Sequence, residues 1–96
     1  MKPSEALHLH REQVRRIVAA HHAHNARVFG SVLRGDDEEG SDLDILIDPT
    51  PETTLMDIGA IRHELRTLLK VDVDVLTLCA IPEKIRAHVL SESAPL

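Results

Sequence analysis

Gly30-Ser31-Val32-Leu33-Arg34-Gly35, followed after five residues by Ser41-Asp42-Leu43-Asp44, is the most informative stretch of this chain. The apolar run at residues 26–29 predicts a short strand that ends at Gly30. Residues 31–34 are then predicted to form one helical turn, because Gly35 suits the left-handed conformation that closes helices. A second strand is predicted from Asp42 to Asp48, where apolar residues recur with a period of two.

Helical and strand periodicities account for most of the remaining chain. A first helix is predicted over residues 4–24, with Ser4 as its N-cap, and a long helix follows a capping box that starts at Thr54. A third strand is predicted at residues 71–78, and a last helix at residues 82–90. The final residues are expected to be loose.

These elements follow one another in the order αβαβαβα. They predict an α/β (α+β) fold in which a small three-stranded mixed sheet is flanked by helices. The long helix between the second and third strands predicts a right-handed crossover between two parallel strands. A chain of 96 residues without repeats or linkers is expected to form a single domain over residues 1–96.

The composition argues against several classes of function. Phe29 is the only aromatic residue, so base stacking on aromatic side chains is not expected. The formal net charge is −5, so direct nucleic-acid binding is not predicted either. Seven acidic residues and no basic residue lie within residues 36–48. The negative charge therefore surrounds the motif, where it would repel a triphosphate unless cations were bound.

Features that would indicate a secreted or membrane protein are missing. Cys79 is the only cysteine, which excludes an internal disulfide. The first residues lack the apolar segment of a secretory signal, and no apolar stretch reaches membrane-spanning length. We therefore expect a cytoplasmic protein that does not bind a membrane.

The turn at Gly30 and Ser31 has the features of a phosphate-binding site. Gly30 has no side chain, so the backbone can approach a ligand, and the first amide groups of the following helix are unsatisfied donors. The Ser31 hydroxyl adds a donor, although an ordinary turn capped by serine has the same residues. Arg34 is a candidate phosphate ligand, and its alternative partners are Asp48 and the acidic loop.

Asp42 and Asp44 are two residues apart on the predicted strand, so their carboxylates project from one face. Two like charges repel at close range, and oxygen ligands of this kind suit Mg²⁺. Two such ions can activate an attacking oxygen and stabilise a leaving one. The alternative is a solvated acidic turn. A third carboxylate is expected from Asp72 or Asp74, which share a face; Asp74 is more central in its strand and is favoured.

Gly30-Ser31, Asp42-Leu43-Asp44 and Asp74, in this order, resemble the pattern of the minimal nucleotidyltransferase family. This is the family of the MntA-like antitoxins, within the DNA polymerase β-like nucleotidyltransferase superfamily. Arg34-Gly35 and Ser41 also match it, and the resemblance spans roughly residues 26–80. It implies the nucleotidyltransferase fold, with ATP as substrate and a nucleotide site formed by Gly30, Ser31, Arg34 and Ser41. It also implies that Asp42, Asp44 and Asp74 are the catalytic residues and hold two Mg²⁺ ions.

The resemblance further implies a role in a toxin–antitoxin pair. Members of the family are typically antitoxins whose partner is a HEPN-domain ribonuclease toxin, so a hetero-oligomer is expected. The implied activity is that of a protein adenylyltransferase, which moves AMP from ATP onto a tyrosine hydroxyl of the toxin. Two alternatives stay open: an antitoxin that neutralises by binding alone, with a dormant nucleotide site, and a small-molecule nucleotidyltransferase subunit.

Overall fold

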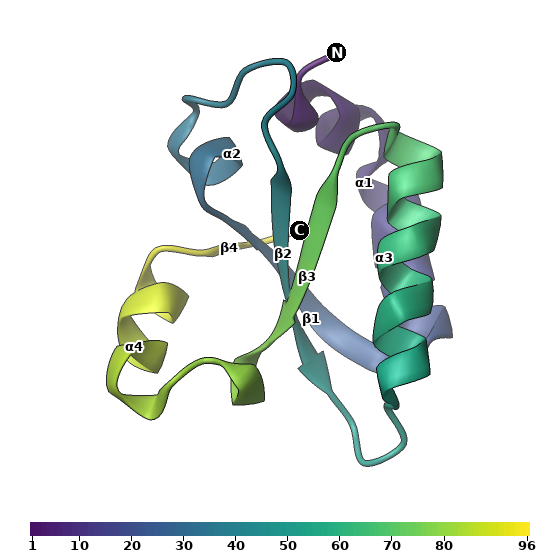
Figure 1. The fold of residues 1–96 in the computed structure, drawn as a ribbon, viewed down its shortest axis with the longest axis vertical. Helices are drawn as coiled ribbons and strands as arrows, with labels where there is room; N and C mark the ends of the chain where they lie inside the picture. Colours follow the sequence, from purple (N-terminus) through teal and green to yellow (C-terminus); the bar gives the residue numbers. More distant parts are fainter.

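A computed structural model describes residues 1–96 (Figure 1). The elements, in chain order, are α1 (Pro3–Ala20), β1 (Ala23–Phe29), α2 (Ser31–Arg34), β2 (Leu43–Pro49), α3 (Leu55–Leu69), β3 (Val73–Thr77), the 3₁₀-helix η1 (Leu78–Ala80), α4 (Glu83–Ser91) and β4 (Ala94–Pro95). The predicted α/β class, with helices around a small mixed sheet, is confirmed. None of the helices combines the length and the apolar character that crossing a membrane requires.

The sheet has the strand order β3-β2-β1-β4. β1 runs antiparallel to both β2 and β4, whereas β2 and β3 are parallel. Parallel neighbours need a long connection, and α3 supplies it, as the sequence predicted. The parallel arrangement matters for the site because β2 and β3 then start from the same end of the sheet.

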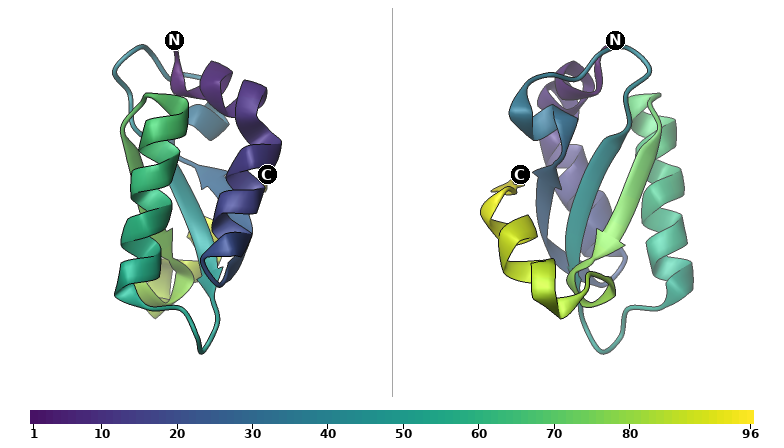
Figure 2. Two further views of the ribbon diagram at one scale, coloured as in Figure 1. Left: turned by 90° about the vertical axis from the view of Figure 1, so that its right-hand side faces the viewer. Right: turned by 60° about the vertical axis from the view of Figure 1, so that its left-hand side comes forward.

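The two long helices cover one face of the sheet. Figure 2 shows α1 and α3 side by side over this face, while α2 and α4 lie towards the other. The core forms where alternate residues of β2 meet these helices; its fully buried side chains include Leu43, Ile45, Ile47, Val14, Ile61 and Leu65. Each such side chain stabilises the fold by roughly 1.5–3 kcal/mol relative to an exposed position. The predicted inward face of β2 is therefore confirmed.

A capping box begins α3, as predicted. The Thr54 hydroxyl accepts a hydrogen bond from the Asp57 backbone N–H over 3.1 Å, and the Asp57 carboxylate accepts one from the Thr54 N–H over 2.9 Å. The backbone hydrogen bond from Thr54 is the main reason that the pKa of the Asp57 carboxyl lies below its ordinary value. The box satisfies donors that would otherwise be unpaired at the helix start.

The prediction that the final residues are loose is wrong, and the sheet has four strands rather than three. Ala94 and Pro95 pair with β1, and the Leu96 N–H donates to the Ala26 carbonyl over 3.0 Å. Leu96 is buried, and its carbonyl accepts a hydrogen bond from Arg15 Nε over 2.7 Å. A strand of two residues leaves no periodic pattern in the sequence, which explains why it was missed.

The start of α1 also differs from the prediction. Lys2 occupies the N-cap position, and Ser4 lies inside the helix. The Ser4 N–H is satisfied instead by Asp37 Oδ2, 2.9 Å away, from the acidic loop. Burial would raise the pKa of the Asp37 carboxyl, but the hydrogen bonds from Ser4 outweigh it and lower that pKa. A hydrogen bond from a distant loop leaves no local signal in the sequence, so the local pattern favours Ser4 as the N-cap.

The end of α1 was predicted about four residues too late. The helix stops at Ala20, and His22 has a φ of 63°, a left-handed conformation that no helix continues. β1 therefore begins at Ala23 and includes His24, which was predicted to be helical. The remaining predicted bounds agree with the structure to within two residues.

The capping box gives a test of the fold. Thr54→Ala should lower the free energy of unfolding by about 1 kcal/mol, because the Asp57 N–H loses its acceptor. Thr54→Ser keeps the hydroxyl and should retain most of the stability. Urea denaturation of the three proteins measures the difference. Equal stability of the alanine and serine variants would contradict the role assigned to the hydroxyl.

Candidate active site

The parallel pairing of β2 and β3 brings two of the predicted carboxylates together. Asp44 and Asp74 are direct partners in the register of the two strands. Side chains of paired residues in neighbouring strands project from the same face. This is the face opposite α1 and α3, because Leu43 and Ile45, on either side of Asp44, are both buried in the core. Asp44 is half-buried, and Asp74 is exposed.

The third predicted carboxylate, Asp42, is exposed immediately before β2. Its effect appears in the electrostatics of Asp44. Burial raises the pKa of the Asp44 carboxyl, and the negative charges of Asp74 and Asp42 raise it further, while Arg34 partly offsets the increase. The neighbouring charges of Asp74 and Asp42 therefore add to the energetic cost that burial imposes on ionised Asp44. A cation bound between them would remove that penalty.

The turn at Gly30 lies directly against Asp44. Phe29, the last residue of β1, is paired with Asp44, and Gly30 follows with a φ of 78°. A Cβ atom on Gly30 would lie 2.5 Å from Asp44 Oδ2, which is too close for any side chain. Glycine is thus required here twice, by the backbone conformation and by the carboxylate. Ser31 begins α2 beside this turn and is half-buried.

Arg34 is exposed at the end of α2. Of the partners considered from the sequence, the structure selects the acidic loop, because Arg34 Nε lies 3.4 Å from Asp36 Oδ2. Asp48 instead accepts a hydrogen bond from Asn25 Nδ2 over 2.9 Å. The Arg34–Asp36 contact is long and solvated, so it leaves the guanidinium able to turn towards a phosphate.

Ser41 has a structural contact in addition to its predicted role. Its hydroxyl accepts a hydrogen bond from the Glu38 N–H over 2.9 Å, and its own N–H donates to the Glu38 carbonyl over 3.0 Å. These bonds close the turn that precedes Asp42. Together with the contact of Asp37 to α1, they fix the path of the acidic loop into β2. Asp37 anchors this loop, although in the sequence it is only one residue of an acidic run.

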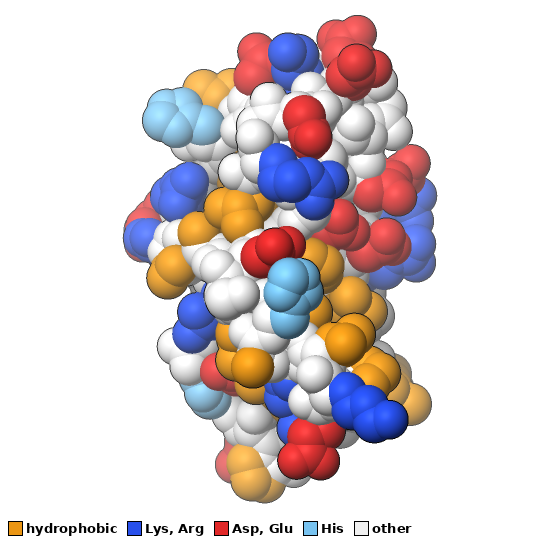
Figure 3. Space-filling view, turned by 90° about the vertical axis from the view of Figure 1, so that its left-hand side faces the viewer, with side chains coloured by type: hydrophobic (Ala, Val, Ile, Leu, Met, Phe, Trp, Pro, Cys, Tyr) orange, Lys and Arg blue, Asp and Glu red, His pale blue; other side chains and the backbone are white.

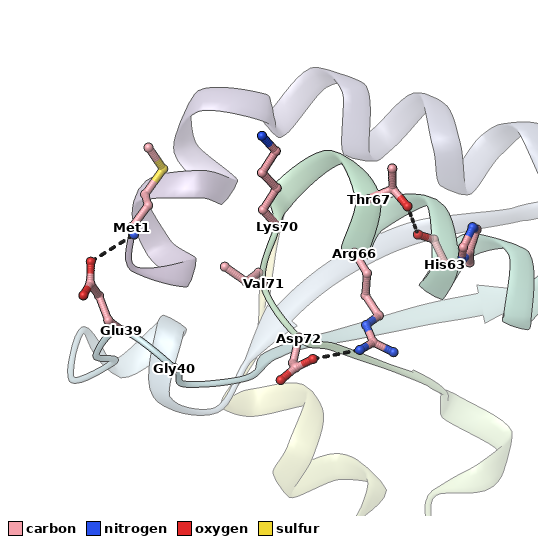
Figure 4. Close-up of a pocket in the computed structure, with 9 residues that line it drawn as sticks. All are labelled: Met1, Glu39, Gly40, His63, Arg66, Thr67, Lys70, Val71 and Asp72. Atoms are coloured by element: carbon pink, nitrogen blue, oxygen red, sulfur yellow. Dashed lines mark hydrogen bonds and ion pairs between the residues drawn. The ribbon is translucent and has the colours of Figure 1, made fainter.

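Asp72, the alternative third carboxylate, is separated from this group. Its carboxylate forms an ion pair with Arg66 over 3.0 Å, and its backbone carbonyl accepts the Leu43 N–H. Figure 4 shows Asp72 and Arg66 in a hollow of about 680 Å³ beside the C-terminal end of α3. None of Asp42, Asp44 or Asp74 lines this hollow. The geometry therefore favours Asp74 over Asp72.

The donor set indicates which metal the site suits. No group of three His, Cys, Asp or Glu side chains is arranged closely enough to hold a metal ion unaided. The facing residues offer carboxylate oxygens alone, which are ligands for Mg²⁺ rather than for zinc. Mg²⁺ commonly takes one or two protein carboxylates and completes its shell with water and substrate phosphates. The residues present fit an ion of that kind.

The raised pKa of Asp44 predicts a gain in stability on its removal. Ionised Asp44 destabilises the fold at neutral pH, and this effect disappears as the pH falls through the folded pKa towards the unfolded value. Asp44→Asn should therefore unfold at a higher urea concentration than the parent at about pH 7 with a chelator present. The advantage should shrink at about pH 4. Asp48→Asn, on the same strand, should show no such gain.

The contact between Gly30 and Asp44 can be measured with a double-mutant cycle. Gly30→Ala places alanine at a φ of 78° and a ψ of −150°, a conformation almost confined to glycine, and its Cβ would also displace the Asp44 carboxylate. Urea unfolding should show a smaller loss of stability from Gly30→Ala when Asp44 is already alanine, because only the backbone strain then remains. Equal losses in the two backgrounds would mean that Asp44 moves aside without cost.

Known proteins are similar to this chain in sequence and in fold. A protein of Methanocaldococcus jannaschii named "Putative protein adenylyltransferase MJ0435" is 34% identical over 77 residues, which cover 80% of this chain and 83% of that protein. A solved structure described as "Structure of putative minimal nucleotidyltransferase" superposes with a TM-score of 0.89 at 40% identity, covering 97% of this chain and 95% of the other.

A more distant structure shows the same fold. It is described as "Crystal structure of the toxin-antitoxin with AMP-PNP", with a TM-score of 0.75 at 17% identity over 88% of this chain and 69% of the other. The family model described as "Polymerase beta, Nucleotidyltransferase" matches residues 12–96, a range that contains the Gly30 turn and all three carboxylates. The chain therefore belongs to the polymerase beta nucleotidyltransferase family.

Proposed function

We propose that this protein is the antitoxin of a toxin–antitoxin pair and transfers AMP from ATP to a tyrosine hydroxyl of a HEPN-domain toxin. The observation that carries the proposal is the pairing of Asp44 with Asp74 beside the Gly30 turn. It is supported by the relative named as a protein adenylyltransferase and by the toxin–antitoxin structure of the same fold, which was solved with AMP-PNP. The use of ATP also fits the cytoplasmic location expected from the sequence.

Each residue group has a distinct role in this proposal. Gly30 and Ser31 bind the β- and γ-phosphates, with Arg34 turning from Asp36 to the phosphates and Ser41 beside them. Asp42 and Asp44 with Asp74 would hold two Mg²⁺ ions, which would supply positive charge to polarise the α-phosphate and stabilise the departing oxygen. Charge neutralisation of this kind suits a site in which burial and two neighbouring charges already penalise an ionised Asp44.

Transfer of AMP replaces one oxygen on the α-phosphorus of ATP by another. The acceptor hydroxyl oxygen forms a bond to the α-phosphorus, and the bond from that phosphorus to the bridging oxygen breaks. Pyrophosphate leaves with the bonding electrons. Asp74, which is exposed, accepts the hydroxyl proton as the oxygen attacks and then releases it to water.

The test is transfer to the partner, followed by intact mass. The chain, the toxin and ATP with Mg²⁺ should yield toxin heavier by one or more AMP units. Asp42→Asn/Asp44→Asn should abolish the gain, and Asp74→Asn should slow it by about 100-fold or more, whereas Asp72→Asn and Asp48→Asn should retain activity. Omission of Mg²⁺ should give no transfer.

The same experiment distinguishes AMP transfer from the alternative in which the antitoxin neutralises the toxin by binding alone. If the toxin gains no mass, yet the Asp42→Asn/Asp44→Asn variant still binds and neutralises it, the protein acts by masking its partner. The transferase proposal would then be wrong. Loss of activity in Asp72→Asn, with Asp74→Asn still active, would instead reassign the third carboxylate.

A further inference from the structure

A large apolar side chain lies open to solvent beside the candidate active site. Leu76 on β3 is 40% exposed, although Leu46, its partner in the register on β2, is completely buried. The same asymmetry holds one row earlier, where Asp44 is half-buried and Asp74 is exposed. The face is thus covered along β2 and open along β3, which is the edge strand of the sheet.

The strand register defines two rows of paired side chains, and the distance between these rows is fixed by the backbone. Asp44–Asp74 and Leu46–Leu76 are separated by two residues on the same face, a spacing of about 7 Å. Along the right-hand edge of Figure 3, acidic side chains with Lys and Arg side chains among them lie above a group of hydrophobic side chains. A molecule lying along β3 therefore meets carboxylates at one end and an aliphatic surface at the other.

We propose that Leu76 selects a phenolic acceptor by packing against its aromatic ring while the hydroxyl lies at the Asp44–Asp74 row. This inference rests on the proposed transfer to a protein hydroxyl and adds the residue that determines its specificity. Tyrosine is the protein side chain that joins a hydroxyl to a rigid apolar body, and the length of that body is comparable to the spacing of the rows.

The short hydroxyl side chains do not use this surface. A serine or threonine whose oxygen reached Asp74 would bring its own backbone over Leu76, and a polar peptide would then cover an apolar side chain without hydrogen bonds. Ring-on-ring stacking is not available at this face, because Phe29 is the only Phe, Tyr or Trp of the chain and lies on β1. Leu76 offers an exposed aliphatic surface for the ring instead.

The first test observes binding and does not depend on catalysis. The full chain, with labelled leucine methyl groups, Mg²⁺ and AMP-PNP, is titrated with N-acetyltyrosinamide and, separately, with N-acetylserinamide. The tyrosine probe should shift the Leu76 methyl signals, whereas the serine probe should not. Leu55, which is 87% exposed at the start of α3, is the internal control and should stay unchanged.

The second test uses transfer to the toxin. Leu76→Ala should lower kcat/KM for the tyrosine acceptor about tenfold, leave the KM for ATP unchanged, and reduce the preference for tyrosine over a serine placed at the same position. Leu76→Met should restore most of the rate. Leu55→Ala, an equally large truncation of an exposed leucine, should have no effect.

The outcomes distinguish this inference from the proposed function. Transfer to tyrosine that is unaffected by Leu76→Ala would overturn the role of Leu76 and leave the transferase assignment standing. If no acceptor is modified, the proposed function fails, while the methyl shifts still decide whether Leu76 contacts a phenol. Shifts at Leu76 caused by AMP-PNP alone, with a raised KM for ATP in Leu76→Ala, would assign the residue to the nucleotide and overturn the inference.

Discussion

Repulsion between carboxylates on neighbouring parallel strands is the constraint on which the rest of this structure depends. Asp44 cannot withdraw from Asp74, because the register of β2 and β3 is fixed by Leu43 and Ile45, which are fully buried beneath the long helices. The hydrophobic core therefore holds two like charges together that would separate in a flexible chain. Bound positive charge would relieve both the burial of an ionised Asp44 and this repulsion, which is why the proposed Mg²⁺ site suits these residues.

The surroundings of Asp44 are built to keep this arrangement. Gly30 lies so close to the carboxylate that a Cβ there would force Asp44 to shift, and the acidic loop is held at Asp37 by the first turn of α1. The hydroxyl of Ser41 closes the turn before Asp42. These contacts position the carboxylates, and Arg34 only partly offsets their charge, so the electrostatic environment of Asp44 is preorganised and negative.

The sequence predicted the features that depend on periodicity and on local chemistry. The alternation in β2, the capping box at Thr54 and the parallel connection through α3 all follow from patterns within about fifteen residues. The features that it missed depend on distant partners. Asp37 replaces Ser4 as the residue that serves the start of α1, and Leu96 joins β1 from the far end of the chain. The choice between Asp72 and Asp74 required the strand register, which a single sequence leaves open by one step.

The two faces of the sheet contribute differently to stability. α1 and α3 supply the buried side chains of the core, whereas α4 contributes no fully buried residue. Substitutions in α4 and on the open side of β3 therefore alter little of the free energy that holds the chain together. The open side of β3 can therefore change its side chains, and with them what this face contacts, without weakening the core beneath the carboxylates.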